Sequence, residues 1–380
     1  MPSILVLCEY PSLNGGERSL LAALEHETRE ECGIQVAAPA TGPLAESLRS
    51  LRIRHIPLDL HDGNGRRLAL DECRQRLRRI IQATRPDVIH ANSLSMSRLS
   101  GPLTAELDVP GLGHLRDIIR VNRRVIDDLN CHARLLAVSE ATRRWFTDLG
   151  VDGPRVHVMY NGVDLQRFRP RRPTGYLHRE LRLPLDAPLI GAIGQVGIRK
   201  GLDVLLAAAG AIVEQHPSAQ IVIVGQRYSQ KHEATDYESR LLAAASTPPL
   251  RGRVHFLGLR DDVSEILSEV TLLVHAARQE PLGRVLLEAA AVGVPVVATS
   301  VGGTPEIFRS PDEAILLPPG DPVRLATAVQ RLLGDPAARK KLSLAARRRA
   351  ETTFSVEAAS QSLLRHYRSV GRLKGGVAAG

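Results

Sequence analysis

The sequence predicts an α/β protein with two doubly wound parallel-sheet domains. Short apolar runs alternate with helical stretches along the chain, which is typical of parallel sheets covered by helices on both faces. The alternation is interrupted once, at residues 169–175 (RPRRPTG), by a basic and proline-rich segment that cannot form regular structure. The chain has 380 residues, more than a single hydrophobic core usually supports. Two domains of similar construction are therefore expected, joined near residue 170.

The first half of the chain alternates strand and helix from its beginning. A short apolar run at residues 4–7 suits a first buried strand, and a loop at residues 11–18 (PSLNGGER) leads into a helix over residues 19–24. Residues 161–164 (NGVD) form a turn before the linker. Further strands are predicted at residues 34–38, 53–57, 87–90, 111–115, 135–138 and 156–159.

The second half repeats the pattern. Strong helix formers without Gly or Pro predict a helix over residues 284–291, and residues 294–299 read as a buried strand. Residues 321–367 are predicted to be mostly helix. Earlier strands of this half are predicted at residues 189–194, 221–225, 254–258 and 272–275. Ligands of such sheets bind beyond the carboxyl ends of the strands, so functional residues are expected there.

Composition narrows the class of protein. With 43% hydrophobic and 24% charged residues, the chain is typical of a globular protein. No apolar run approaches about 18 residues, and the N-terminus has neither a basic n-region nor a cleavage site, so neither a membrane span nor a signal peptide is expected. The four cysteines are scattered, which favours a reduced, cytoplasmic protein over a metal site.

The formal charge of +9 favours phosphate-bearing partners. Aromatic residues make up only 3% of the chain and no nucleic-acid motif is present, so nucleic acid is not expected as a partner.

Residues 278–308 (RQEPLGRVLLEAAAVGVPVVATSVGGTPEIF) carry the strongest site signal. The unpaired N–H groups at the start of the predicted helix attract anions, and Gly283 lets a phosphate approach the backbone closely. Glu280 and Glu288 are eight residues apart, a little over two helical turns, so both can face one cleft. Carboxylates accept hydrogen bonds from neighbouring hydroxyls of ribose and sugar rings. Two glutamates at this spacing also occur on many solvated helix faces. The loop at residues 302–305 (GGTP) is tight enough to contact a ligand.

These motifs together resemble a known family. Glu280-Pro-Leu-Gly-x4-Glu288, followed by Gly-Val-Pro-Val-Val-Ala-Thr and Gly-Gly-Thr-Pro-Glu-Ile, is similar to the signature of retaining nucleotide-sugar glycosyltransferases of glycosyltransferase family four (glycosyl transferases group 1). The resemblance covers nearly the whole chain and implies the GT-B fold, in which two Rossmann-like domains face each other across a cleft. It implies an acceptor-side domain over residues 1–170 and a nucleotide-sugar-binding domain over residues 171–355. A C-terminal helix at about residues 356–372 is expected to pack back on the first domain.

The resemblance also assigns roles to residues. Glu280 holds the hydroxyls of the donor sugar, Lys200 balances the charge of the leaving diphosphate, and His114 contacts the transferred sugar through hydrogen bonds; these three are the predicted catalytic residues. The predicted donor-binding residues are Gly16, Gln195, Arg199, Leu282, Gly283, Arg284, Glu288 and Gly258. The predicted acceptor-side residues are Gly15, Glu17 and Arg116.

Several of these residues have simpler interpretations. A Gly-Gly pair is often only a turn, Glu17 suits the first turn of a helix, and a single histidine such as His114 is often structural. His90, at the end of the preceding strand, is a weaker candidate. The family usually carries Arg five residues before Lys200, but Gln195 stands here.

Either Arg199 or Arg284 is expected to supply the charge that Gln195 lacks, or Gln195 donates a neutral hydrogen bond in its place. The implied reaction needs no metal and no cofactor beyond the nucleotide sugar. The sequence agrees, because no Asp-x-Asp ends a strand.

Donor and acceptor are less defined. The resemblance slightly favours a UDP-sugar over a GDP-sugar, and the acceptor is a carbohydrate, a lipid-linked molecule or a small molecule, in glycan, polysaccharide or glycolipid synthesis. The basic stretches 66–79 and 116–124 read as solvated faces, or else as a patch that holds the protein peripherally at the inner face of an anionic membrane. A nucleotide-sugar epimerase or hydrolase, or a non-catalytic nucleotide-sugar-binding protein, remain the alternative functions.

Overall fold

In a computed structural model, which describes residues 1–25 and 31–375, the chain forms two compact units. Unit 1 comprises Met1–Gly162 and the C-terminal segment from Val356, and unit 2 comprises Val163–Ser355. The division follows Gly162 rather than residue 170, because residues just after it are bonded within unit 2. Val163 donates its N–H to the carbonyl of Phe354 at 2.8 Å, and Arg347 Nη1 donates to the carbonyl of Phe168 at 2.9 Å.

Unit 1 is built on a seven-stranded parallel sheet with the order β3-β2-β1-β4-β5-β6-β7. The strand order reverses between β1 and β4, and in doubly wound sheets ligands bind beyond the carboxyl ends of the strands at this point. The strands are β1 (Ser3–Leu7), β2 (Gly33–Ala38), β3 (Arg54–Pro57), β4 (Val88–Ala91), β5 (Gly111–Leu115), β6 (Arg134–Ala137) and β7 (Val156–Val158).

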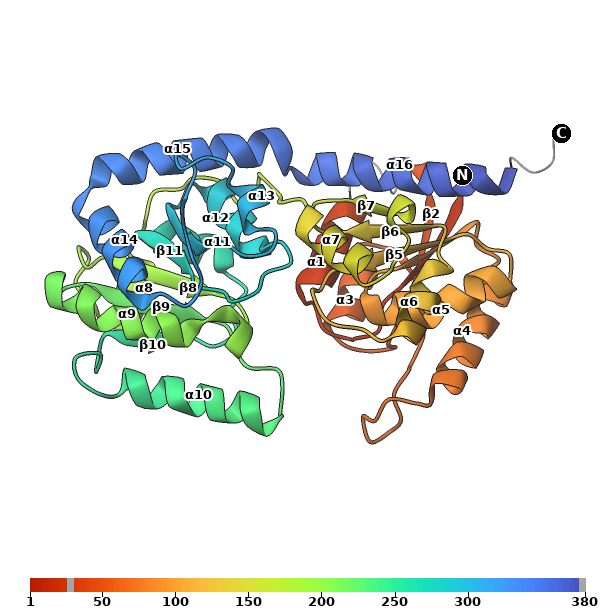
Figure 1. The fold of residues 1–380 in the computed structure, drawn as a ribbon, viewed down its shortest axis with the longest axis horizontal. Coiled ribbons are helices and arrows are strands. Elements are labelled where there is room, and N and C mark those ends of the chain that lie inside the picture. Colours follow the sequence, from red (N-terminus) through yellow and green to blue (C-terminus); the bar gives the residue numbers. More distant parts are fainter. Residues whose placement is uncertain (26–30, 376–380) are drawn as a thin grey trace. The chain divides into compact units, whose positions relative to one another are not determined.

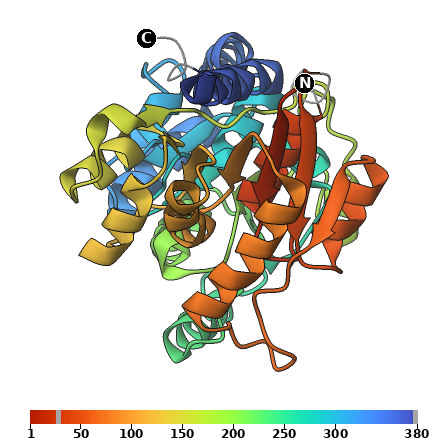
Figure 2. The same ribbon diagram turned by 90° about the vertical axis from the view of Figure 1, so that its right-hand side faces the viewer.

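Helices cover both faces of this sheet (Figures 1 and 2). Successive side chains of β1 show why: Ile4 and Val6 join one buried cluster, whereas Leu5 and Leu7 join another. The helices are α1 (Gly15–Leu24), α3 (Pro43–Ser50), α4 (Leu70–Thr84), α5 (Leu94–Glu106), α6 (Arg123–Asn130), α7 (Glu140–Asp148) and α16 (Val356–Gly375), with a 3₁₀ turn at Gly153–Arg155.

The C-terminal helix α16 packs on unit 1 against α1 (Figure 1). Its buried residues Leu363, Leu364, Tyr367 and Val370 recur at helical spacing and form one apolar stripe. Burial of this stripe against the sheet fixes the helix, since helices in proteins draw most of their stability from packing.

Unit 2 repeats the architecture with a six-stranded parallel sheet of order β10-β9-β8-β11-β12-β13. Its order reverses between β8 and β11. The strands are β8 (Leu189–Ile193), β9 (Gln220–Val224), β10 (Val254–Phe256), β11 (Leu272–His275), β12 (Val296–Thr299) and β13 (Ile315–Leu317). The helices are α8 (Tyr176–Leu181), α9 (Leu202–Gln215), α10 (His232–Ala245), α11 (Val263–Glu269), α12 (Arg284–Val292), α13 (Thr304–Ile307), α14 (Pro322–Gly334) and α15 (Pro336–Thr353), with a 3₁₀ turn at Ile198–Lys200.

The predicted strands are confirmed, but some helix bounds were wrong. Helix α1 begins at Gly15 rather than at residue 19, because Glu17 accepts a hydrogen bond from the Asn14 N–H at 3.2 Å and so caps the first turn. The segment 321–367 is not continuous: Asp335 accepts from the N–H of Ala338 at 2.9 Å and starts a new helix. Strand β13 was not predicted; it has only three residues, Ile315–Leu317.

The basic stretch 66–79 is helical only in part, since α4 starts at Leu70 and runs to Thr84. Arg66 and Arg67 lie before it, where Arg66 donates its N–H to Asp62 at 2.8 Å and Arg67 forms an isolated bridge with His61.

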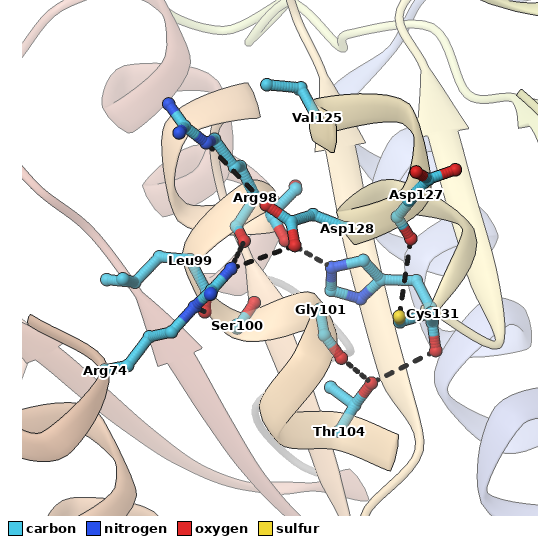
Figure 3. Close-up of polar contacts among 12 residues, drawn as sticks. Arg74, Arg98, Leu99, Ser100, Gly101, Thr104, Val125, Asp127, Asp128 and Cys131 are labelled. Carbon is cyan, nitrogen blue, oxygen red and sulfur yellow. Dashed lines mark hydrogen bonds and ion pairs between the residues drawn. The ribbon is translucent and has the colours of Figure 1, made fainter. Parts of the chain in front are cut away.

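The arginines of α4 have partners within unit 1. Arg74 reaches Asp128 of α6 at 2.9 Å, and Arg98 of α5 lies 3.7 Å from the same carboxylate (Figure 3). Arg76 and Arg78 pair with Glu72 and Glu106. The pairs of Arg74, Arg98 and Arg78 join helices α4, α5 and α6, whereas Arg76 and Glu72 both lie on α4. A membrane-binding patch at residues 66–79 stays a prediction. In the described part of the chain, no helix is long and apolar enough to cross a bilayer.

Candidate active site

A charged cluster lies where the strand order of unit 2 reverses. Lys200 follows β8 and Glu280 follows β11, so the two chain segments meet at the carboxyl ends of neighbouring strands. The Lys200 ammonium donates to Glu280 Oε2. His275 Nε2 lies 2.8 Å from the same oxygen, and Arg199 Nη1 lies 3.7 Å from Glu280 Oε1. A small pocket adjoins this cluster, lined among others by Gly194, Gln195, Lys200 and His275.

The cluster holds an ionised carboxylate in a buried position. Glu280 is only 6% exposed. Burial alone would raise the pKa of its carboxyl, but Lys200, His275 and Arg199 together outweigh burial and hold that pKa well below its ordinary value. Burial lowers the pKa of Lys200, although the charge of Glu280 opposes this change. Burial also lowers the pKa of His275. A neutral His275 donates its Nε2–H to Glu280, so the site carries cationic groups around one internal anion.

Two glycines allow the backbone to close around these residues. A side chain at Gly201 would place its Cβ 1.9 Å from the carbonyl oxygen of Ala276, and one at Gly302 would place it 1.8 Å from the carbonyl oxygen of Glu280. Both glycines also have positive φ angles, 64° and 53°. Gly303 donates its N–H to the Glu280 carbonyl at 3.0 Å. The Gly-Gly-Thr-Pro loop, predicted to contact a ligand, thus directly supports the backbone of Glu280.

Helix α12 begins as the sequence predicts. Gly283 is its N-cap, with φ of 104°, and Leu282 beside it is buried. Glu288, 7% exposed, lies within this helix and pairs with Arg284 at 2.8 Å. Arg284 therefore balances Glu288, which makes Arg199 the better placed cation to compensate for Gln195. Gln195 itself is exposed.

Gly258 follows β10 at the same edge of the sheet. Its carbonyl accepts the N–H of Gly225 at 2.7 Å, and Gly225 follows β9. Arg260 is held by Asp262 and Glu180, at 2.7 and 2.6 Å. Gly258, a predicted donor-binding residue, is thus in a segment ordered by contacts within unit 2.

The predicted acceptor-side residues of unit 1 also gather at carboxyl ends of strands. A Cβ at Gly16 would lie 3.1 Å from Cδ of Arg116, so this glycine gives the arginine room, whereas Gly15 has open space. Arg116 donates to Asn92 Oδ1 at 2.8 Å and to Asn161 Oδ1 at 2.9 Å. Burial lowers the pKa of Arg116 to about 10, and it stays charged at neutral pH. Glu17 caps the first turn of α1, which is the structural interpretation given for it in the sequence.

His114 ends β5 and is part of a buried chain of side chains. Its Nδ1 lies 2.8 Å from His90 Nε2, and His90 Nδ1 lies 2.6 Å from the hydroxyl of Tyr367 on α16. Burial lowers the pKa of His90 to about 3 and the pKa of His114 well below its ordinary value, with Arg116 acting in the same direction. Both rings are therefore neutral.

Two residues of these clusters were not predicted. His275 ends an apolar strand five residues before Glu280, and a polar residue at that position was a usable signal. Tyr367 gave no signal, because its partner His90 is 277 residues away in the sequence. Among the described residues, no group of His, Cys, Asp and Glu side chains is arranged to hold a metal ion.

Two family descriptions match the chain. Residues 176–349 match "Glycosyl transferases group 1", and residues 13–167 match "Glycosyltransferase Family 4". The GDP-mannose-dependent alpha-mannosyltransferase of Mycobacterium tuberculosis is 30% identical, covering 95% of this chain and 94% of that protein. A D-inositol 3-phosphate glycosyltransferase of Xylanimonas cellulosilytica is 28% identical, covering 88% of this chain and 85% of that protein.

Solved structures agree on the fold. HepE of Anabaena in complex with UDP-glucose superposes with a TM-score of 0.85 at 22% identity, covering 97% of this chain and 100% of that one. Sucrose-phosphate synthase of Thermosynechococcus elongatus gives a TM-score of 0.82 at 21% identity, covering 98% and 100%. The two Rossmann-like parallel-sheet units thus define an α/β protein of the GT-B class, as predicted. The chain belongs to glycosyltransferase family four and is a glycosyltransferase.

Proposed function

We propose that this glycosyltransferase moves a sugar from a nucleoside diphosphate sugar to an acceptor hydroxyl, with retention of configuration and without a metal ion. The observation that carries the proposal is the buried Lys200–Glu280 pair at the strand reversal of unit 2, with Arg199 beside it. A diphosphate leaving group develops negative charge, and preorganised cations in a water-poor site stabilise that charge strongly.

The donor roles follow from this placement. Lys200 and Arg199 would balance the diphosphate, Glu280 would accept hydrogen bonds from the sugar hydroxyls, and Glu288 would hold the ribose. Leu282 and Gly283 would offer backbone N–H groups at the start of α12. The backbone at Gly258 would lie beside the base.

Unit 1 would supply the sugar and acceptor side. His114 and Gly16 would face the transferred sugar, and Arg116 with the first turn of α1, from Gly15 to Glu17, would shape the acceptor site. The acceptor remains one of three classes: a carbohydrate, a lipid-linked molecule or a small molecule.

The donor can be identified by thermal unfolding, because a ligand that binds only the folded protein raises the midpoint. GDP-mannose is the first candidate, since the relative at 30% identity is GDP-mannose-dependent by name. UDP-glucose is the second, because a protein of the same fold binds it. GDP and UDP alone separate recognition of the nucleotide from recognition of the sugar. Transfer is then tested by product analysis with acceptor pools, and NMR of the new glycosidic bond tests retention. Donor consumed at full rate without an acceptor would instead indicate a hydrolase or epimerase.

Lys200→Ala tests the role of the buried cation. Loss of one preorganised charge-stabilising group typically lowers kcat by about 10²–10³-fold, and we expect kcat to fall at least as much as donor affinity. Lys340→Ala, at an exposed lysine of α15, is the matched control and should leave both unchanged. An unchanged kcat in Lys200→Ala contradicts the assignment.

A further inference from the structure

Three buried side chains connect the C-terminal helix to the candidate site of unit 1. Tyr367 of α16, His90 at the end of β4 and His114 at the end of β5 are 1%, 0% and 2% exposed. The Tyr367 hydroxyl lies 2.6 Å from His90 Nδ1, and His90 Nε2 lies 2.8 Å from His114 Nδ1. Each of these two hydrogen bonds contains one proton, which belongs to one of the two groups that it joins. The three side chains therefore donate either from Tyr367 toward His114 or from His114 toward Tyr367.

Arg116 decides the direction. Its Nη2 lies 3.3 Å from His114 Nδ1, and a guanidinium group only donates hydrogen bonds. His114 Nδ1 must therefore be an acceptor. His90 then donates to it from Nε2, and Tyr367 donates its hydroxyl proton to His90 Nδ1. The remaining proton of His114 lies on Nε2.

This arrangement leaves one hydrogen-bond donor unused. Among the described residues, His114 Nε2 has no hydrogen-bond partner. Burial holds the pKa of both imidazoles far below neutrality, so neither ring gains a second proton near pH 7. Each ring therefore keeps one donor nitrogen and one acceptor nitrogen. The Nε2–H of His114 is therefore a fixed neutral donor over the whole range near pH 7.

We propose that Tyr367 is a positioning residue, which acts with His90 and Arg116 to present His114 to a ligand as a neutral N–H donor at Nε2. The identity of that ligand, a nucleotide sugar, rests on the proposed function, but the ordering of protons does not. The proposal also gives helix α16 a direct part in the site, in addition to covering the apolar face of unit 1.

Tyr367→Phe removes one hydroxyl group, and with its proton the only donor to His90 Nδ1 that the described residues supply. The phenyl ring keeps its packing against the apolar cluster around Leu363 and Leu364. His90 Nδ1 is then buried without a donor, a situation that proteins avoid. A proton on Nδ1 would be equally unpaired there, so without the hydroxyl the two neutral forms of His90 come closer in free energy. The second form turns Nε2 into an acceptor and draws the proton of His114 to Nδ1. Arg116 opposes this second state, so the two states compete and the fraction of His114 with an Nε2–H falls.

The ordering of protons is tested on the full chain labelled with ¹⁵N-histidine. Two-bond ¹H–¹⁵N spectra distinguish the two neutral forms of imidazole, and the loss of one ring from the spectrum of His114→Gln identifies the His114 signals. We expect protonated Nε2 in the wild type and partial transfer to Nδ1 in Tyr367→Phe. A wild-type His114 protonated on Nδ1, or on both nitrogens, overturns the proposal whether or not the protein transfers sugar.

The effect on turnover is tested against a matched variant. Tyr237 is 3% exposed and donates its hydroxyl to Asp203 at 2.8 Å, so Tyr237→Phe also removes one buried hydroxyl. A weakened neutral hydrogen bond in the transition state corresponds to about a three- to ten-fold fall in kcat. We expect this fall in Tyr367→Phe, with donor KM changed by less than about two-fold, and not in Tyr237→Phe. Equal kcat in the two variants contradicts the positioning role. If no variant and no wild type shows transfer, the proposed function fails while the spectra still decide the ordering of protons.

Discussion

Replacing Glu280 by Gln should destabilise unit 2 even without any ligand. The substitution keeps the shape of the side chain and removes only its charge. In the folded protein this charge faces Lys200, whose side chain is 14% exposed, and Arg199, which is 39% exposed. Without the carboxylate, Lys200 must either remain charged with poor solvation or lose its proton.

The size of the effect follows from these exposures. Removing one partner of a fully buried ion pair typically costs about 3–5 kcal/mol of unfolding free energy. Here the exposed edge of Arg199 and the hydrogen bonds retained by the Gln side chain reduce the cost, so we expect about 2–3 kcal/mol. The double variant Lys200→Met/Glu280→Gln removes both charges and should recover much of this loss, because apolar replacements of buried pairs are often nearly neutral.

Urea unfolding without nucleotide measures these energies. Amide hydrogen exchange of peptides from β8 and β11 reports on unit 2 itself, which has its own core. The double-mutant cycle should give a coupling energy of about 2 kcal/mol. The pair Lys341–Asp312, 2.8 Å apart but 70% and 57% exposed, is the matched control and should give a coupling near zero. A Glu280→Gln variant as stable as the wild type would refute the argument that the pair is poorly solvated.

The same pair sets a direction for pH dependence. The folded pKa of Glu280 is lowered, so its contribution is complete above the pKa of an unfolded Glu, about 4.3. The contribution is lost as the pH falls from there toward the lowered folded value. The unfolding free energy of Glu280→Gln should therefore fall less steeply below about pH 5 than that of the wild type.

Two glycine substitutions should separate close packing from backbone strain. Gly302→Ala would force the Glu280 carbonyl away, since its Cβ would lie 1.8 Å from that oxygen, and should lower both Tm and donor affinity. Gly320→Ala has a comparable positive φ of 79° but open space around its Cβ, so it should lower Tm by backbone strain alone and by less than Gly302→Ala. Gly101→Ala would place a Cβ 1.9 Å from the carbonyl oxygen of Asp128 and should lower Tm by separating α5 from α6, without affecting donor affinity in titrations. Equal melting temperatures of the two variants at 302 and 320 would contradict the role of close packing.

The sequence predicted the fold because each strand carries its own signal. Apolar runs such as residues 4–7 and 272–275 predict buried strands from their own composition. The single break near residue 170 indicates that the pattern of strands and helices starts again in a second domain. Bounds were less predictable where a polar contact decides them, as at Asn14–Glu17, where a cap adds four residues to a helix that apolar pattern alone would begin at Ser19.

The residues of the candidate site also divide into those that the local sequence pattern identifies and those that it does not. Lys200 and Glu280 lie on strand-to-helix segments that the pattern identifies, so their meeting at one sheet edge follows from topology. The partners that set the chemistry of the two sites come from elsewhere: His275, beside Glu280, is the last residue of a strand, and Tyr367, beside His90, lies on a helix at the far end of the sequence. Such pairs depend on how elements pack, and no local periodicity encodes them.

The cluster of unit 2 also suggests how a donor would change its own binding site. A buried lysine needs an anion, and Glu280 provides one. On the proposed function, a diphosphate would take over as the partner of Lys200, and Glu280 would then be free to accept hydrogen bonds from sugar hydroxyls. His275 keeps its hydrogen bond throughout and would hold the carboxylate in place during this exchange. Because the ion pair already holds both side chains at the site, organising them around a diphosphate would cost less free energy.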